Sequence, residues 1–336
     1  MLDLLKSLCN IDGTSGDERS VRDFIISQID GFCDWKTDNL GNIIAFKKGK
    51  KAPKRKIMLD AHTDEVGLII TSITSDGFLK FKTVGGIEAS ALMFRAVKIN
   101  GSLNGVISGK PVHLLSADEK KKAAKAESLY IDIGATSKEE AEAMVTLGDT
   151  AILCGEYAEN GDYIISKAID DRIGCAVLIS LLKNDSEYDF YASFSVQEEV
   201  GLRGAKVSAY SINPDSAIVL EATTAADIAG VADDSKVCKL GNGVAVSFMD
   251  RATVYDKAYY TAALNSGLPC QPKAAVAGGN NSGAVHLSRE GVRTIALSVP
   301  CRYIHTSSSI ASKKDCESLL ALTKYMLCGI ASGEIE

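Results

Sequence analysis

The hydrophobic pattern of the chain alternates between two periods over most of its length. Short apolar runs, typical of buried strands, alternate with longer segments in which apolar residues recur every three or four positions, as on one face of a helix. We expect strands at 57–61, 189–196, 217–220 and 294–299, and helices at 3–29, 171–183 and 313–328. Two further strand-like runs flank the turn at 39–42. This alternation predicts an α/β domain.

The pattern changes between residues 66 and 163. Short β-rich runs are separated there by glycines, and the one helix candidate, 137–145, begins with the capping-box pair Ser137 and Glu140. This segment predicts a small β-barrel or sandwich inserted into the main domain. We therefore expect one domain made of residues 1–65 and 164–336, interrupted by a β-rich domain at 66–163.

Composition and charge narrow the class of protein. The 336 residues are 46% hydrophobic and 24% charged, which suffices for a sizeable core, and the net charge of -6 argues against nucleic acid or an anionic membrane as the partner. The nine cysteines include no C-x-x-C pair, and no signal peptide or membrane-spanning run is recognised. We expect a cytoplasmic protein. The charged runs at 47–56 and 118–127 are expected to be solvated loops.

Five short segments carry side chains suited to binding metal ions. They are Ala-His62-Thr-Asp64-Glu65, Ile-Asp170-Asp171-Arg172, Gln197-Glu198-Glu199-Val-Gly201, Leu-Glu221-Ala and Arg302-Tyr-Ile-His305. Each follows or ends a strand-like run, and open α/β sheets bind their ligands at the carboxyl ends of their strands. The ordered set predicts a hydrolase that uses two divalent ions, with zinc as the first choice.

Some of these residues have an ordinary alternative interpretation. His62 could be a surface histidine near a turn, and Asp170 with Asp171 could merely begin a helix, where acidic residues are common. Glu221 taken alone is more typical of a surface or capping residue. Because neighbouring strand residues point to opposite faces, Glu198 and Glu199 are expected to differ in role, one binding metal and the other facing the reacting water.

Other catalytic classes lack their motifs. A serine nucleophile elbow, a phosphate-binding Walker loop and a dinucleotide-binding glycine motif are all missing from the sequence. A glycosidase would need two carboxyls held apart across a sugar bond, and adjacent glutamates serve that geometry poorly. His113 and His286 have no acidic neighbour at ligand spacing and are expected to be structural.

The ordered motifs resemble those of the glutamyl-aminopeptidase and tetrahedral-aminopeptidase family of two-metal exopeptidases. The resemblance runs nearly end to end and includes Asp38-Asn39-Leu-Gly41-Asn42 and Arg302-Tyr-Ile-His305. It implies a mixed-sheet, three-layer α/β metallopeptidase domain with an inserted β-barrel-like domain. It also implies an enzyme that removes N-terminal residues from short peptides.

The resemblance also implies a role for each site residue. His62, Asp170 and Glu221 would hold one metal ion, and Asp170, Glu199 and His305 the other, so that Asp170 bridges the two. Glu198 would be the general base, Asp64 would orient His62, and a cis peptide would join Asp170 to Asp171. Nitrogen and oxygen ligands admit zinc, cobalt or manganese.

Two residues depart from the family pattern. Glu221 stands where many relatives carry aspartate, and Asn281 stands where an acid is usual. If that acid orders the site, activity could differ here, so a catalytically impaired assembly subunit stays open as an alternative, beside a related two-metal deacylase or dipeptidase. Relatives also assemble through the inserted domain, which implies a homo-oligomer, from a dimer up to a tetrahedral dodecamer.

Overall fold

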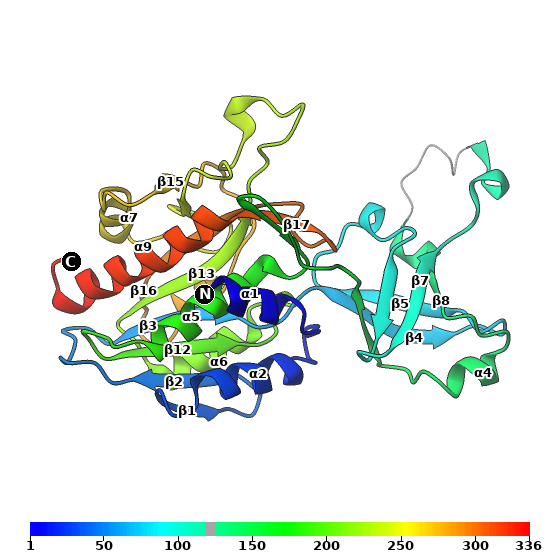
Figure 1. Ribbon diagram of the computed structural model, residues 1–336, viewed down its shortest axis with the longest axis horizontal. Helices are drawn as coiled ribbons and strands as arrows, with labels where there is room; N and C mark the ends of the chain where they lie inside the picture. The colour runs from blue at the N-terminus through cyan, green and yellow to red at the C-terminus, as the bar shows by residue number, and fades with distance from the viewer. Residues whose placement is uncertain (118–124) are drawn as a thin grey trace.

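A computed structural model describes residues 1–117 and 125–336 of the chain. Figure 1 shows two lobes, a larger one in which helices cover a sheet and a smaller one formed by a β-barrel. Of the charged run expected as a loop at 118–127, residues 118–124 lie outside the described part of the chain. The chain leaves the larger lobe after its third strand and returns to it with the tenth.

The larger lobe contains an 11-stranded mixed sheet. Its main path runs in the order β1-β2-β12-β3-β13-β16-β17-β11-β10, and β14 pairs with both β15 and β16. The strands are β1 (Asp34–Thr37), β2 (Ile43–Lys47), β3 (Ile57–His62), β10 (Ala158–Asn160), β11 (Tyr163–Ser166), β12 (Phe190–Ser195), β13 (Ser216–Thr224), β14 (Val244–Val246), β15 (Cys270–Pro272), β16 (Arg293–Arg302) and β17 (Ser309–Ser312).

Four central strands of this sheet run parallel to one another. β3 pairs with β12 on one side and β13 on the other, and β13 pairs with β16, all in parallel register. The register places Ser195 beside His62 and Glu221 beside Ser298. Parallel strands have their carboxyl ends at one edge of the sheet, so residues from four distant segments meet there.

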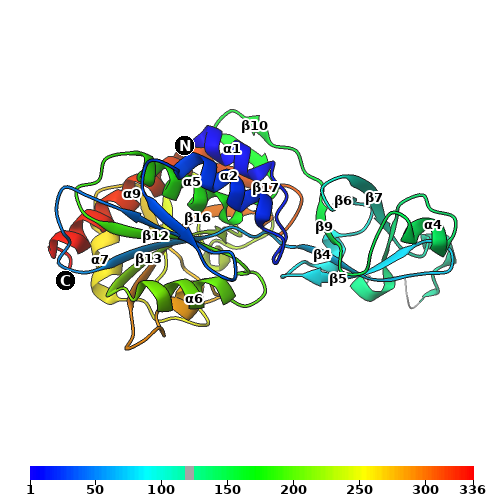
Figure 2. The ribbon, with the colours of Figure 1, turned by 90° about the horizontal axis from the view of Figure 1, so that it is seen from below.

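Helices cover both faces of the sheet, which gives three layers (Figure 2). Helices α1, α2, α5 and α9 pack on one face, and α6 and α8 on the other. The helices of this lobe are α1 (Leu2–Cys9), α2 (Arg19–Ile29), α5 (Ile169–Lys183), α6 (Arg203–Ile212), α7 (Lys257–Leu264), α8 (Ser282–Val285) and α9 (Lys313–Ser332). Within the described residues, no helix is both long and apolar enough to span a bilayer.

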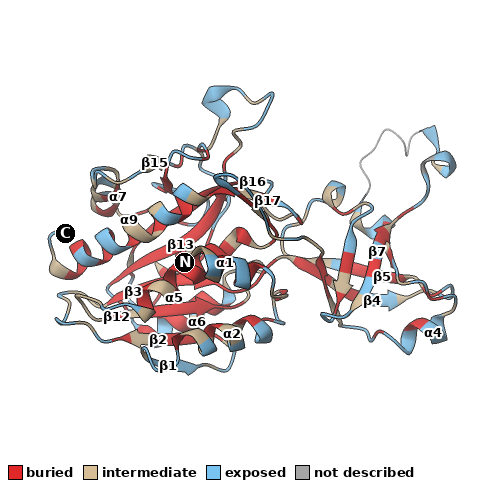
Figure 3. Ribbon diagram, in the orientation of Figure 1, coloured by how far each residue is buried: buried red, intermediate tan, exposed pale blue. Residues whose placement is uncertain are grey.

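The smaller lobe is a closed barrel with its own hydrophobic core. Its strands follow the order β4-β5-β8-β7-β6-β9. They are β4 (Gly67–Ile73), β5 (Leu79–Val84), β6 (Ala96–Ile99), β7 (Leu103–Ser108), β8 (Tyr130–Asp132) and β9 (Thr150–Leu153), with the helix α4 (Lys138–Glu142) beside them. Figure 3 shows buried residues gathered separately in the large sheet and inside the barrel. The predicted fold class, a mixed-sheet α/β domain with a small barrel, is confirmed.

The prediction of one long helix at 3–29 is wrong. Helices α1 and α2 are separate, and Gly16 between them has a φ of 92° in the left-handed region that favours glycine. Ser15 does not cap α2, because its hydroxyl donates to the Asp64 carboxylate instead. Glu18 is the N-cap residue of α2 by position, and its carboxylate accepts the N–H of Gly16.

Other predicted elements are present with changed bounds. The helix expected at 137–145 is the shorter α4, and the Ser137 hydroxyl accepts the N–H of Glu140 as a capping box requires. Strands β13 and β16 continue several residues past the ends expected for them. Glu221 is therefore inside β13 rather than at its end.

Asn42 connects the edge of the sheet to the loop that follows β12. Its side-chain oxygen accepts the N–H of Val196 at 2.9 Å, and its side-chain nitrogen donates to the Gly204 carbonyl at 3.0 Å and to Asp38 at 2.6 Å. Asn42 is fully buried. Because water cannot replace these partners, Asn42 holds the backbone on both sides of residues 197–203.

We predict that Asn42→Leu lowers the free energy of unfolding by about 2 kcal/mol, because it leaves the buried N–H of Val196 without a partner. Asn39→Leu, in the exposed part of the same turn, should change it by less than about 0.5 kcal/mol. Urea denaturation followed by the fluorescence of Trp35 on β1, the only tryptophan, measures both. Equal effects of the two variants would contradict this role of Asn42.

Candidate metal centre and active site

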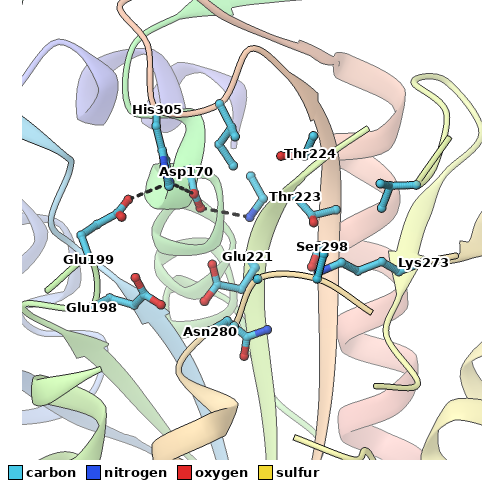
Figure 4. Close-up of a pocket in the computed structure, with 16 residues that line it drawn as sticks. Asp170, Glu198, Glu199, Glu221, Thr223, Thr224, Lys273, Asn280, Ser298 and His305 are labelled. Carbon is cyan, nitrogen blue, oxygen red and sulfur yellow. Dashed lines mark hydrogen bonds and ion pairs between the residues drawn. The ribbon is translucent and has the colours of Figure 1, made fainter. Parts of the chain in front are cut away.

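All of the residues predicted to form the site lie at the carboxyl edge of the parallel strands. His62 is the last residue of β3, Glu221 lies in β13, and His305 follows β16. Glu198 and Glu199 follow β12, and Asp170 lies at the start of α5. Asp170, Glu198, Glu199, Glu221 and His305 line one pocket, drawn in Figure 4.

Asp170 lies between the two histidines. Its Oδ1 is 3.5 Å from Nε2 of His62, and its Oδ2 is 3.4 Å from Nε2 of His305. The backbone at Asp170 and Asp171 is not helical, and the peptide bond between them is cis, as the resemblance implied. Each carboxylate oxygen of Asp170 therefore faces a different imidazole.

Glu221 and Glu199 complete two groups of ligand-type atoms. Oε2 of Glu221 is 3.7 Å from Nε2 of His62, and Oε1 of Glu199 is 3.2 Å from Nε2 of His305. His62, Asp170 and Glu199 also offer one atom each within 4.8 Å of one another. Most of these separations are longer than hydrogen bonds. They match the spacing of about 3.4 Å between tetrahedral ligand atoms that each lie about 2.1 Å from a zinc ion.

The carboxylates at the site raise the pKa values of both histidines. Burial alone would lower the pKa of His305, but the facing carboxylates of Asp170 and Glu199 raise it to about 11. The pKa of His62 is also raised well above its usual value, against the effect of burial, by Asp170 and Asp64. In the protein alone, protons on the imidazoles thus balance the carboxylates. A cation held by the same atoms would take over that balance.

Burial dominates the titration of two glutamates at the site. It raises the pKa of Glu198 to about 8, although the nearby His62 opposes the shift. It raises the pKa of Glu221 well above its usual value, and the Oε1 atom of Glu221 is buried with no hydrogen-bond partner among the described residues. A carboxylate oxygen left unpaired in this way fits a site that takes up a cation.

The Asp64 carboxylate holds several parts of the site together. It accepts the N–H groups of Glu198 at 3.0 Å and Glu199 at 3.1 Å, and the hydroxyl of Ser15 at 2.6 Å. Its Oδ1 is 3.4 Å from Nδ1 of His62, while the carbonyl of Asp64 itself is nearer to that nitrogen, at 3.0 Å. Asp64 thus faces the ring nitrogen of His62 that points away from Asp170, and it fixes the backbone of both glutamates.

Asp171 supports the backbone rather than facing the other carboxylates. Its side chain accepts the N–H of Gly174 at 2.9 Å and that of His62 at 3.2 Å. It is fully buried. The second aspartate of the pair therefore acts as a cap of α5 and an anchor of β3.

The sequence predicted that Glu198 and Glu199 point to opposite faces of a strand, and this prediction is wrong. β12 ends at Ser195, and Gln197 has a φ of 56°, so the two glutamates lie in a turn beyond the strand. Both side chains line the pocket. Their difference lies in their neighbours, because Glu199 faces His305 while Glu198 makes no ion pair with a described residue.

A segment next to the barrel also contacts the site. The carbonyl of Gly86, just after β5, is 2.9 Å from Nδ1 of His305, so this nitrogen can donate to it while Nε2 faces Asp170 and Glu199. A Cβ on Gly85 would lie 2.8 Å from Val66 and 3.2 Å from Glu199. Nothing local in the sequence marks this contact, because no side chain identifies a carbonyl acceptor.

Asn281 does not line the pocket. It is fully buried, and its side-chain nitrogen donates to Asp60 and to the hydroxyl of Ser195, each at 2.8 Å. Burial raises the pKa of Asp60 to about 6, while hydrogen bonds from Ser193, Ser195 and Asn281 act in the opposite direction. The amide of Asn281 therefore lies directly beside the buried carboxyl group of Asp60.

We predict that Asn281→Asp destabilises the protein by about 2–4 kcal/mol near pH 8, because two buried carboxyls would then lie side by side. The proton that they share has a raised folded-state pKa, so stability is lost as pH rises and the cost should be smaller near pH 5. The exchanged pair Asp60→Asn with Asn281→Asp restores one acid and one amide and should recover most of the stability. Urea denaturation at both pH values tests this, and an exchanged pair no more stable than Asn281→Asp would refute it.

Comparison with known proteins gives relatives over the full length of the chain. The chain is 33% identical to the glutamyl aminopeptidase of Lactococcus lactis, covering 94% of this chain and 92% of the relative. It is 31% identical to the lysyl aminopeptidase of Pyrococcus furiosus, covering 97% and 96%.

The fold is also shared with a solved structure. The TET1 peptidase of Pyrococcus horikoshii superposes with a TM-score of 0.84 at 33% identity, covering 98% of this chain and 99% of that one. Residues 41–322 match the model of the M42 glutamyl aminopeptidase family. The chain therefore belongs to the M42 glutamyl aminopeptidase family and is a peptide hydrolase.

Proposed function

We propose that the protein is an aminopeptidase that removes N-terminal residues from short peptides by means of two divalent ions and a glutamate base. Membership of the M42 family supports the aminopeptidase activity. The observation that carries the two-ion part is Asp170, whose two oxygens each face a different histidine at 3.5 and 3.4 Å. A carboxylate placed in this way suits a bridge between two cations.

The donor set fits such ions. His62, Asp170 and Glu221 would hold one ion, and Asp170, Glu199 and His305 the other. All donors are imidazole nitrogens and carboxylate oxygens, which suit zinc, cobalt or manganese, and zinc is the first choice. When bound, two such ions lower the pKa of a water molecule and polarise the peptide carbonyl.

Glu198 is the residue that we assign as general base. It lines the pocket beside the proposed ligands, and no described side chain occupies it as an ion-pair partner. Its pKa of about 8 in the protein alone means that proton uptake and release both lie near neutral pH, and nearby cations would lower that value. Glu198 would take a proton from the attacking water and deliver it to the departing amine.

The pocket sets a limit on the substrate. Its volume is about 210 Å³, below the 300–1,000 Å³ usual for pockets that bind drug-sized molecules. This volume suits the first residue of a peptide. A free α-amine would have a lone pair to offer to the proposed ions, whereas an acylated nitrogen would not, which supports action on the N-terminal residue rather than on an acylated one.

We further propose a cytoplasmic homo-oligomer in which the inserted domain at 66–163, whose barrel runs from β4 to β9, serves assembly. The TET1 peptidase of Pyrococcus horikoshii can form a tetrahedron or a large octahedral shell. Large apolar side chains are exposed in the barrel region, including Phe94 at 70% and Leu147 at 59%. Burial of such side chains between subunits would favour assembly, and light scattering of the purified protein measures its size.

We predict that Glu198→Gln lowers kcat by about 10²- to 10⁴-fold, since it removes the proton acceptor but keeps the shape of the side chain. Metal content, measured by mass spectrometry, should stay at two ions per chain. Glu290→Gln, on the exposed surface, is the matched control and should keep full activity. The assay uses free and N-acetylated peptides that differ in their first residue. Cleavage of the acetylated set would identify a deacylase instead.

We predict that metal binding releases protons and tightens as pH rises, because the two imidazoles carry protons with raised pKa values in the protein alone. Calorimetry in buffers of different ionisation enthalpy counts the released protons. His305→Ala should bind one ion instead of two, whereas His113→Gln, at an exposed position, should bind both. The same stoichiometry in wild type and His305→Ala would refute the two-ion assignment.

A further inference from the structure

Lys273 lies in the wall of the active-site pocket. It directly follows β15, and its backbone N–H donates to the carbonyl of Val246 at 2.9 Å, which fixes the main chain there. Lys273 is only 7% exposed. Figure 4 shows its side chain extending along the pocket toward Ser298, on the opposite side from Glu198 and Glu199.

The Lys273 ammonium has no partner among the described residues. Three lysines in the described part of the chain are buried, at positions 47, 167 and 273. Lys47 donates to the carbonyls of Phe32 and Leu182, and Lys167 pairs with Glu65 at 2.6 Å. No described acceptor or carboxylate lies within hydrogen-bond or ion-pair distance of the Lys273 side chain. Its nitrogen is not among the fully enclosed unpaired atoms of the described residues, so the ammonium faces the pocket, and a cation without a counter-charge there points to an anion that arrives with a ligand.

The position of Lys273 relative to the proposed metal-binding residues determines which part of a substrate the Lys273 side chain contacts. Ser298 pairs with Glu221 across neighbouring strands, so the two residues lie about 4.8 Å apart along the sheet. Lys273 extends toward Ser298 from the far side. A substrate whose α-amine lies among the carboxylates can therefore direct its first side chain toward Lys273.

The walls between these two ends suit a short, polar side chain. Thr223, Thr224 and Ser298 offer hydroxyls, while Val237 and Ala277 are small and apolar. The remaining charged residues of the pocket are the proposed ligands and base. Lys273 is thus the only described lysine or arginine that lines the pocket.

We infer that Lys273 pairs with the side-chain carboxylate of an N-terminal glutamate or aspartate and thereby makes acidic first residues the preferred substrates. This inference rests on the proposed aminopeptidase function. Glutamyl and lysyl aminopeptidases both occur among the relatives, so the preference belongs to the residues of each pocket rather than to the family as a whole. In this chain the Lys273 ammonium sets the preference for the first residue.

The test compares first residues that differ only in charge. Metal-loaded full-length protein is assayed with the p-nitroanilides of glutamate, glutamine, leucine and lysine, which lack a peptide carboxyl terminus. The wild type should prefer glutamate over glutamine by at least about tenfold in kcat/KM, the loss typical of one charged hydrogen bond. Lys273→Met should reduce that ratio by at least about tenfold, and Lys273→Arg should keep most of it.

A binding measurement makes the test independent of turnover. Calorimetry with free glutamate and free glutamine, which share the same α-amine and α-carboxylate, should show tighter binding of glutamate by about tenfold in wild type. Lys273→Met should lose the difference, and Lys324→Met, at an exposed position, should keep it. If no anilide is cleaved but this difference is found, the proposed activity fails and the role of Lys273 stands.

Two results would overturn the role of Lys273. One is a glutamate-to-glutamine ratio, in cleavage or in binding, that Lys273→Met leaves unchanged. The other is a preference for a dipeptide over its C-terminal amide that depends on Lys273, together with an unchanged glutamate-to-glutamine ratio. That second outcome would assign the ammonium to the carboxyl terminus of the peptide.

Discussion

Repulsion among buried carboxylates is the constraint on which the arrangement of this protein depends. Asp170, Glu198, Glu199 and Glu221 line one small pocket, and two imidazoles are the only ones in the described part of the chain that face them directly. Such a cluster is stable only if protons or cations balance it, and if the backbone around it cannot relax. The raised pKa values of both histidines and of Glu198 express the first condition. The hydrogen bonds of Asp64, Asp171 and Asn42 meet the second.

The parallel centre of the sheet makes this concentration of charge possible. Strand ends from the two halves of the sequence meet at one edge, so His62 and His305 face the same aspartate although 243 positions separate them in the sequence. Each side chain then needs only a short loop or one helix start to reach the site. The supports are correspondingly local, since Asp64 holds the turn with both glutamates and Asp171 holds β3 to α5.

Motifs at strand ends were enough to predict which residues gather at the site, because residue type and order can be read directly from the sequence. The details that depend on backbone torsions were not predictable in the same way. The left-handed turn at Gln197 brings Glu198 and Glu199 to one pocket. The break before α2 places the Ser15 hydroxyl where it donates to the Asp64 carboxylate. Contacts between distant residues were hidden as well. Asp60 and Asn281 are 221 positions apart, and nothing local marks Lys273 as buried.

The contact between Gly86 and His305 has a consequence for how the two lobes can change. A residue adjoining the barrel supplies the acceptor for a histidine of the other lobe, and Gly85 leaves no room for a side chain against Val66 and Glu199. The barrel is therefore not a detachable appendage. A shortened chain that kept only the large sheet would lose the Gly86 carbonyl, and Asp170 and Glu199 alone would then orient the His305 ring. A foreign barrel grafted in its place would have to reproduce this glycine pair at the same junction.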